Sequence, residues 1–417
     1  MDYEDILMAL KNGNIPPKGT LDLAMERDKE IQEFEKILSQ IESGKAVVKF
    51  INGQFGAGKS FFLKVIEEMA YKNNFAVSWI TLSNEIPFNK FDVVYRNIAQ
   101  NLKVKTGEGL THIMNRWIAG IKMKAIDEDD DPINQNKLIV ENIQEDLKNV
   151  RIHSNSIATA IEHYYKFSNS SDNEMASHVQ AWLRGDSKIP FTVKREFGVK
   201  GDVDKESAMK FLEALSVFIK SAGYSGLVVL LDEAEFIMKL HTKKLRDIAY
   251  NYMRDLYDEC SKGNFKNSLF VFAGTPQFFE DSKKGIRSYQ ALENRITKVI
   301  KSKAKDLRTP IIELEGFNKK ETLMEIATKL MVMHEEVYKW NASDKFTPII
   351  ENIATKHEEN TELTEGKVIP RTFMKSFISA LDTVEQNQEL FESKEPILEL
   401  FDDKDNESSD DFDDEDW

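Results

Sequence analysis

The chain has 417 residues, more than one compact core accommodates, and this length predicts two or three domains. Its hydrophobic share of 41% and charged share of 30% are typical of a soluble globular protein, and no apolar run approaches the roughly 18 residues that cross a bilayer. The net charge of −15 argues against a generally basic nucleic-acid binder, although ten acids and one lysine lie in residues 401–417.

The beginning of the chain and its cysteine content predict a cytoplasmic protein. Residues 1–5 are acidic and lack the basic and apolar regions of a secretion signal. The single cysteine, Cys260, excludes an intramolecular disulfide and suits a reducing compartment. We expect Cys260 to be a half-buried residue of a helix.

The first 45 residues predict an N-terminal arm followed by a helix. A polar stretch with proline and glycine covers residues 12–20. Apolar residues then recur at helical spacing between Ile31 and Ile41, so one face of a helix is expected to be buried there. An apolar run over 46–51 predicts the first strand of the core.

A phosphate-binding loop of the form G-x-x-x-x-G-K-[ST] follows this strand at residues 53–60. Helical apolar spacing from Phe61 to Tyr71 gives the loop the strand–loop–helix setting that the motif requires. Its glycines let backbone N–H groups turn toward phosphate oxygens, Lys59 can reach the β- and γ-phosphates, and Ser60 can ligate Mg²⁺. The loop therefore predicts binding of a nucleoside triphosphate. The expected nucleotide-binding residues are Gly53, Gln54, Phe55, Gly56, Ala57, Gly58, Lys59, Ser60 and Phe61.

Later apolar runs predict that the sheet is parallel. A run over 75–82 lies about one helix after the first strand, a spacing typical of a βαβ crossover. Residues 91–205 have the pattern of several amphipathic helices and predict a helical insertion, with an acidic loop at 127–132 and a polar loop at 168–173. Further strands are expected at 226–231, 268–273 and 310–314, and helices at 206–222 and about 240–261.

This order predicts an α/β fold, a P-loop NTPase with a parallel αβα sandwich, a helical insertion and a C-terminal α-helical lid. The pattern is helical from Lys319 to about Glu392, and the acidic, low-complexity end of the chain predicts disorder. The expected domains are an arm and helix at 1–45, a P-loop core at 46–310, a lid at 311–395 and an acidic tail at 396–417.

Two acids, Asp232 and Glu233, follow five consecutive apolar residues. Such a run is typical of a central parallel strand, whose end opens beside the phosphate loop. Asp232 would hold a hydrated Mg²⁺ ion, and Glu233 would activate the attacking water as a general base. The pair favours hydrolysis over transfer to a small-molecule acceptor. The alternative is that the two acids only cap a strand.

The residues after the next strand supply a candidate γ-phosphate sensor. In additional-strand P-loop ATPases, a polar side chain at this position lies between the two acids and the γ-phosphate. Thr275 is the candidate here and Gln277 the second choice. A Gly-Thr-Pro turn without such a role is the alternative.

Two arginines are candidates for stabilising the charge on a transferring phosphoryl group. In oligomeric ATPases of this class, an arginine after the fourth strand often reaches the γ-phosphate of the neighbouring subunit. Arg295 lies in that region, and Arg287 is its alternative. Arg371 begins the last strong helix, where an arginine of the lid commonly acts within its own chain. An ordinary surface salt bridge is the alternative for each.

Several segments resemble the BrxC/BrxD family of P-loop proteins from bacterial BREX phage-defence systems, over roughly residues 20–385. The segments are GKSFFL at 58–63, AWLRG at 181–185, GYSGLVVLLDE at 223–233, FAGTP at 272–276 and SYQAL at 288–292. The AWLRG and GYSGL segments are more specific than the phosphate loop, and the length of the chain is closer to BrxD. The resemblance implies an AAA+-like ATPase that uses ATP and Mg²⁺ and acts beside a helicase, a methyltransferase or other defence components on DNA.

Three other features of the sequence bear on ligands and partners. The seven histidines lack metal-site spacing, so a protein-ligated metal site is not expected. Acids flank two aromatic residues in 410–417, which is typical of a solubilising disordered end, of a motif that docks into a basic-rimmed pocket, or of a segment that competes with DNA for a basic groove. Residues 26–31 are similar to an adenine-pocket motif of related ATPases, but Glu26 stands where glycine is usual.

Together these features predict a cytoplasmic protein that binds and hydrolyses ATP and couples turnover to assembly or remodelling of a defence complex on DNA. A homo-oligomer or hetero-complex is expected, because an arginine that acts in trans needs a neighbour. Contact with DNA, and docking of a partner by the acidic tail at 401–417, stay open. The alternatives are a nucleotide-gated scaffold that does not hydrolyse ATP and a regulator of a partner helicase.

Overall fold

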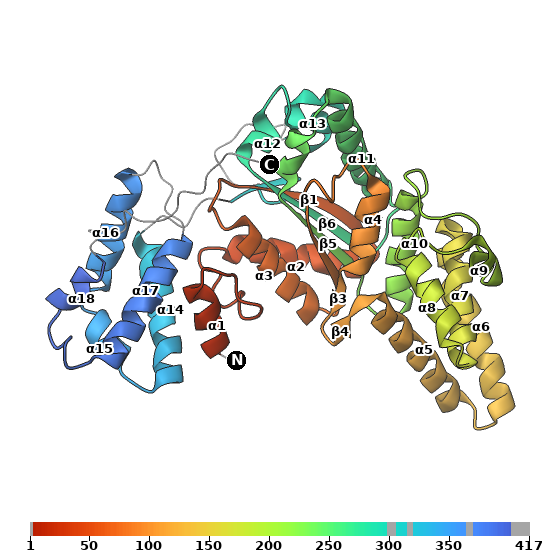
Figure 1. Ribbon diagram of the computed structural model, residues 1–417, viewed down its shortest axis with the longest axis horizontal. Coiled ribbons are helices and arrows are strands. Elements are labelled where there is room, and N and C mark those ends of the chain that lie inside the picture. The colour runs from red at the N-terminus through yellow and green to blue at the C-terminus, as the bar shows by residue number, and fades with distance from the viewer. Residues whose placement is uncertain (1–2, 298–305, 315–319, 364–369, 402–417) are drawn as a thin grey trace. The chain divides into compact units, whose positions relative to one another are not determined.

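A computed structural model describes residues 3–297, 306–314, 320–363 and 370–401 (Figure 1). The chain divides into two compact units. The first, here called the core unit, comprises Arg27–Phe55 and Lys59–Glu315. The second, the terminal unit, comprises Met1–Glu26, Gly56–Gly58 and Gly316–Trp417.

The core unit is built on a seven-stranded sheet in the described part of the chain, which confirms the predicted α/β fold with a mostly parallel sheet. The strand order is β4-β3-β2-β5-β6-β1-β7. Five strands run parallel, and β3 and β4 form an antiparallel edge. The strands are β1 (Ala46–Asn52), β2 (Ala76–Thr81), β3 (Leu102–Val104), β4 (Gly107–Glu108), β5 (Leu227–Asp232), β6 (Ser268–Gly274) and β7 (Ile311–Glu313).

The central strands form from uninterrupted apolar runs, which are stable only where both faces of a sheet are covered. Every residue of β5 and β6 is buried. Phe50 of β1 and Phe272 of β6 are register partners, and their rings stack with centroids 5.4 Å apart. Burial of these apolar side chains is the main stabilising contribution to the core unit.

Helices cover both faces of the sheet (Figure 1). On one face, α2 (Asp28–Glu42) packs beside α3 (Lys59–Lys72), and Phe34 meets Phe62 edge-on at 5.5 Å. The other face is covered by α4 (Phe91–Gln100), α10 (Ala208–Ser221) and α11 (Lys243–Ser261). Short elements complete this part of the core unit: η1 (Ala234–Lys239), α12 (Pro276–Glu280), η2 (Ile286–Ser288) and α13 (Gln290–Ile296).

The residues between β4 and α10 are mainly helical, as predicted. The helices are α5 (Gly109–Glu128), α6 (Pro132–His153), α7 (Asn155–Asn169), α8 (Asn173–Leu183) and α9 (Phe191–Glu196). Because α6 packs against α10, its residues Leu147 and Val150 are fully buried. The predicted acidic loop is the turn before α6, where the Asp131 carboxylate caps the helix by accepting a hydrogen bond from the Ile133 N–H (2.9 Å).

The terminal unit is helical wherever it forms secondary structure in the described residues. Its helices are α1 (Tyr3–Lys11), α14 (Lys320–Tyr338), α15 (Ala342–Phe346), α16 (Ile350–Leu363), α17 (Pro370–Gln386) and α18 (Glu395–Glu399). The sequence pattern of residues 3–11 did not predict α1. This helix packs against α14 and α17 and buries Ile6, Leu7 and Leu10, so the beginning and the end of the described chain share one apolar core.

A chain of hydrogen bonds joins α1, α14 and α17. Trp340 Nε1 donates to His334 Nδ1 (2.8 Å), so the proton lies on His334 Nε2, which is 2.9 Å from an oxygen of Asp382. The ammonium of Lys11 lies 2.5 Å from the other oxygen of Asp382. Burial raises the pKa of Asp382, but the hydrogen bonds from His334 and Lys11 outweigh it and hold that pKa below its usual value.

Candidate nucleotide-binding site

The loop at residues 53–60 connects β1 to α3, as the motif predicts. Gly56 and Gly58 have φ angles of +80° and +82°, which side chains with a Cβ atom adopt only at a cost. The N–H of Gly53 donates to the carbonyl of Gly274 at the end of β6 (3.2 Å). The beginning of the loop is therefore held at the carboxyl edge of the sheet.

Lys59 is the first residue of α3 and is 8% exposed. Its ammonium donates to the carbonyl oxygens of Gly53 (3.0 Å) and Gln54 (3.2 Å). The cation is thus held over the backbone of its own loop, at the N-terminal end of a helix, where the helix dipole also favours an anion. Phe55 of the same loop is 80% exposed.

Ser60 and Asp232 meet, although 172 positions separate them in the sequence. The Ser60 hydroxyl donates to Asp232 Oδ2 (2.6 Å), and Asp232 Oδ1 accepts from the N–H of Glu233 (3.0 Å). Asp232 is the last residue of β5 and is 5% exposed. The structure therefore brings together the two residues expected to hold Mg²⁺.

Glu233 follows β5 and is exposed. Its backbone is left-handed, with φ 56° and ψ 42°, and it precedes the first residue of η1. A residue with a Cβ atom in this region stores on the order of 1 kcal/mol of strain or more. At this turn the chain passes from the buried Asp232 to the exposed Glu233.

Glu235, two residues further on, also lies at this site, although no motif in the sequence predicted it. Its Oε2 atom is buried and has no hydrogen-bond partner among the described residues. A Cβ atom added to Gly274 would lie 3.4 Å from this oxygen, so the carboxyl faces the end of β6. Burial and, secondarily, the charge of Glu233 raise the pKa of Glu235, and its own N–H, Lys59 and the Thr275 N–H offset this only in part. The one sequence signal was its closeness to the predicted acid pair.

Thr275 directly follows β6, the strand between β1 and β5. It is half-buried and precedes the first turn of α12, and its backbone N–H faces the Glu235 carboxyl. Thr275 thus lies at the same edge of the sheet as Asp232. Gln277 lies within α12 and is exposed.

The three candidate arginines lie on three different elements of the described chain. Arg295 of α13 makes two hydrogen bonds to the Asp258 carboxylate of α11 (2.5 and 2.8 Å). Arg287 is exposed in η2. Arg371, the second residue of α17, belongs to the terminal unit, where its guanidinium lies beside Gly13. A role for any of these arginines at a phosphate stays a prediction.

Metal binding and membrane insertion can also be compared with the described residues. Within the described ranges, no group of three or more His, Cys, Asp or Glu residues could hold a metal ion. None of the helices in the described part of the chain is long and apolar enough to cross a membrane.

Cys260 is buried on α11, and this burial raises the pKa of its thiol. The two aromatic residues in 410–417, Phe412 and Trp417, lie outside the described residues. Glu26 has a positive φ of 52°, a region that glycine adopts most easily.

Comparison with known proteins identifies the family. No curated protein matches the chain. The family described as BREX system ATP-binding protein BrxC/D matches residues 1–396, nearly the whole chain, and confirms the resemblance drawn from the GKSFFL, AWLRG and GYSGLVVLLDE segments. The chain belongs to the BrxC/D family of ATP-binding proteins of the BREX phage-defence system.

Proposed function

We propose that this protein is an AAA+-like P-loop ATPase that hydrolyses ATP with bound Mg²⁺. The observation that carries the proposal is the 2.6 Å hydrogen bond between Ser60 and Asp232, with the Lys59 ammonium held over the adjoining loop. A hydroxyl and a carboxylate oxygen at this distance suit Mg²⁺, which prefers oxygen ligands and keeps several waters. Ser60 and Asp232 would hold the ion, which would neutralise charge on the phosphates.

The order of the parallel strands supports this assignment. Between β1, which leads into the phosphate loop, and β5, which ends in Asp232, lies β6. This intervening strand is what distinguishes additional-strand P-loop ATPases, and Thr275 follows its last residue at the edge of the sheet where β5 ends in Asp232. The helices of the terminal unit suit the role of the lid that AAA+-like proteins carry.

The residues divide the work of hydrolysis among them. On nucleotide binding, the Lys59 ammonium would exchange its two loop carbonyls for β- and γ-phosphate oxygens. Glu233 would take a proton from a water molecule as that water attacks the γ-phosphorus, and the bond from this phosphorus to the bridging oxygen of ADP would break. Glu235 and Thr275, which face each other at the end of β6, would orient this water and the γ-phosphate.

We further propose that ATP turnover drives assembly or remodelling of a complex with other BREX components on DNA. Arg295, the candidate for contacting the γ-phosphate of a neighbouring subunit, binds Asp258 within its own chain. It would have to exchange this carboxylate for the nucleotide bound to the neighbour. Such an exchange would couple nucleotide state to contact between subunits, in a homo-oligomer or a hetero-complex. Arg371 would act from the lid on the nucleotide of its own chain, and the acidic tail would dock a partner.

The competing function is a nucleotide-gated scaffold, in which ATP binding orders the assembly without turnover. It is favoured by the same contacts, since Lys59 and Arg295 both have hydrogen-bond partners within their own chain. In the scaffold, ATP binding would cause Lys59 and Arg295 to exchange these partners, and no hydrolysis would follow.

Phosphate release from ATP by the native protein and by Glu233→Gln separates the two functions. Loss of a general base costs about 100-fold or more in turnover, so the ATPase predicts this loss in Glu233→Gln with ATP binding retained. Glu196→Gln, an exposed change on α9, is the matched control and should turn over like the native chain. Native turnover no faster than that of Glu233→Gln, with and without duplex DNA, would establish the scaffold instead.

A further inference from the structure

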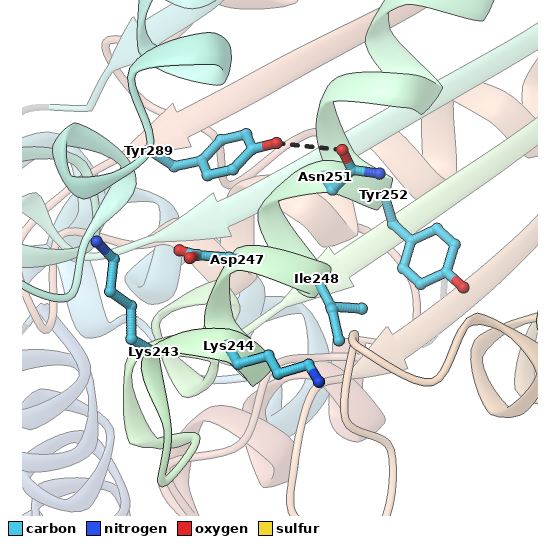
Figure 2. Close-up of a pocket in the computed structure, with 7 residues that line it drawn as sticks. All are labelled: Lys243, Lys244, Asp247, Ile248, Asn251, Tyr252 and Tyr289. Atoms are coloured by element: carbon cyan, nitrogen blue, oxygen red, sulfur yellow. Dashed lines mark hydrogen bonds between the residues drawn. The ribbon is translucent and has the colours of Figure 1, made fainter.

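A second pocket of about 540 Å³ lies on the core unit and shares no residue with the phosphate loop or with the acids after β5 (Figure 2). Its lining residues are Lys243, Lys244, Asp247, Ile248, Asn251, Tyr252 and Tyr289. All but Tyr289 come from α11, where they form two neighbouring rows at helical spacing. The volume is in the range of small-ligand sites.

Basic residues gather at the Lys243–Lys244 end of this pocket, whereas the carboxylates of Asp92, Asp255 and Glu206 lie near Tyr252 at the other end. Lys243 and Lys244 are exposed, and neither forms an ion pair with a residue that the structure describes. Lys283, Lys284 and Arg287 are also exposed, in the segment that leads to Tyr289. The Tyr250 hydroxyl of α11 donates to the Lys284 carbonyl (2.6 Å), which fixes this segment against α11. Asp247 is the only acid among the lining residues, so the end of the pocket that carries the two lysines favours an anion such as a phosphate group.

Contacts with neighbouring side chains fix the positions of the two tyrosine rings of the pocket. Tyr252 stacks on Phe91 of α4, with ring centroids 5.1 Å apart, and is itself half-buried. The Tyr289 hydroxyl donates to Asn251 Oδ1 (3.1 Å), and the Asn251 amide in turn donates to Asp255 (2.8 Å). Figure 2 shows Tyr289 and Tyr252 on opposite sides of the Asn251 position, with the lysines one to two turns away along α11. Rings fixed in this way lose little freedom when a planar group stacks on them.

We propose that this pocket binds an unpaired nucleotide of single-stranded nucleic acid. The lysine ammonium groups contact backbone phosphates, and a base stacks on a tyrosine ring beside Ile248, the combination that single-strand binding sites use. The Asp247 carboxylate accepts a hydrogen bond from the base edge. A duplex keeps its bases stacked and paired and cannot fill the pocket in this way.

The inference deepens the proposed role on DNA and rests on it for its biological setting. The experiment that tests it is independent of the proposed ATPase function, because oligonucleotide binding is measured without ATP. The pocket variants also leave Lys59, Asp232 and Glu233 unchanged. A protein that binds the strand but never hydrolyses ATP would refute the proposed function alone. A protein that hydrolyses ATP but fails to bind the strand would refute this inference alone.

The charge part of the inference is tested by fluorescence anisotropy of a labelled single strand of about 20 nucleotides, long enough to cover one such site. The double variant Lys243→Glu, Lys244→Glu should bind on the order of tenfold more weakly, with a shallower dependence of affinity on salt because two phosphate contacts are lost. The control is the double variant Lys188→Glu, Lys200→Glu, two exposed lysines on either side of α9. It makes the same change in net charge and should bind like the native protein.

The stacking part is tested at Tyr252. Tyr252→Phe keeps the ring on Phe91 and should retain affinity, whereas Tyr252→Ala should lose about tenfold, the usual cost of one stacked base. Thermal melting identifies any variant that has not folded. The inference is wrong if the native protein does not bind the single strand, if the pocket variants bind like the control, or if a duplex binds more tightly. It is also wrong if a peptide of residues 401–417 binds the pocket and the oligonucleotide does not.

Discussion

At the scale of single residues, the two glutamates after Asp232 have opposite surroundings. Glu233 is exposed on a strained turn, whereas Glu235 turns inward and leaves Oε2 buried and unpaired beside Gly274. An ionised carboxylate in such a position lowers the stability of the fold. Proteins mostly retain such costs at functional sites, which supports a positioning role for Glu235 next to the attacking water.

We predict that Glu235→Gln separates activity from stability. The raised pKa of Glu235 means that the folded state resists ionisation, so stability is lost as pH rises from its ordinary value of 4.5 through the folded-state value. Glutamine cannot ionise, so at pH 8 the variant should melt at or above the native temperature. Turnover of ATP should nevertheless fall by about tenfold or more, because the water loses one of its orienting groups.

The matched control for this experiment is Glu280→Gln, an exposed change at the end of α12. It should alter neither the melting temperature nor turnover. If Glu235→Gln lowered the melting temperature and turnover together, Glu235 would be a structural residue. Unchanged turnover would remove Glu235 from the site altogether.

The sequence predicts part of this site for a clear physical reason. Parallel strands end at one edge of a sheet, so acids after one apolar run and a phosphate loop after another must lie close together, as Ser60 and Asp232 do. The burial of Glu235 depends on Gly274 of another strand, and the partner of Arg295 lies 37 positions away on a different helix. Neither relation leaves a local pattern in the sequence.

At the scale of secondary-structure elements, Asp382 is the point at which three helices of the terminal unit meet. It accepts a hydrogen bond from His334 of α14, and it pairs with Lys11 at the end of α1. The buried apolar residues of α1 supply attachment to α14 and α17, and the ionised carboxylate adds hydrogen bonds from charged and neutral donors. Loss of this carboxylate should therefore weaken the attachment of α1 to α14 and α17.

We predict that Asp382→Asn loosens α1 in a pH-dependent way. Because the folded-state pKa of Asp382 is lowered, its contribution is present above its ordinary value of 3.8 and is lost as pH falls through the folded-state value. At pH 7 the free energy of opening of α1 should drop by about 1–2 kcal/mol. Hydrogen exchange of the amides in residues 3–11 measures this opening.

The difference between Asp382→Asn and the native protein should shrink as pH is lowered below 3.8. Glu389→Gln, an exposed change just after α17, provides the control and should leave exchange in α1 unaltered. An equal effect of both substitutions, or an Asp382→Asn effect that grows in acid, would contradict the assigned role of this carboxylate.

The long apolar strands and amphipathic helices could be predicted because each carries its own pattern. By contrast, β3 and β4 have three and two residues and form only as an antiparallel extension of β2. They are too short for an alternating pattern to be recognised. The helix α1 was missed for a related reason, since its nine residues are stabilised by partners more than 300 positions later.

At the scale of the whole molecule, two surfaces of the core unit have separate chemistry. The carboxyl edge of the sheet joins Lys59, Ser60 and Asp232, whereas α11 lines a pocket with two lysines at one end and tyrosine rings at the other. An overall charge of −15 hides these lysines, which is why composition argued against nucleic acid. The match to the BrxC/D family extends over residues 1–396 and therefore includes the residues of both surfaces.

Calorimetric titration of ATP, in Mg²⁺ and in EDTA, into the native protein and Asp232→Asn tests whether the Ser60–Asp232 pair is a magnesium–ATP site. In the native protein, Mg²⁺ should strengthen ATP binding. Asp232→Asn should lose on the order of tenfold or more of this gain, because it weakens the group that holds the hydrated ion. The Lys59 ammonium is unchanged, so the variant should still bind ATP in EDTA as the native protein does. Equal affinity in Mg²⁺ and EDTA for the native protein, or an unchanged Mg²⁺ effect in Asp232→Asn, would contradict the assignment.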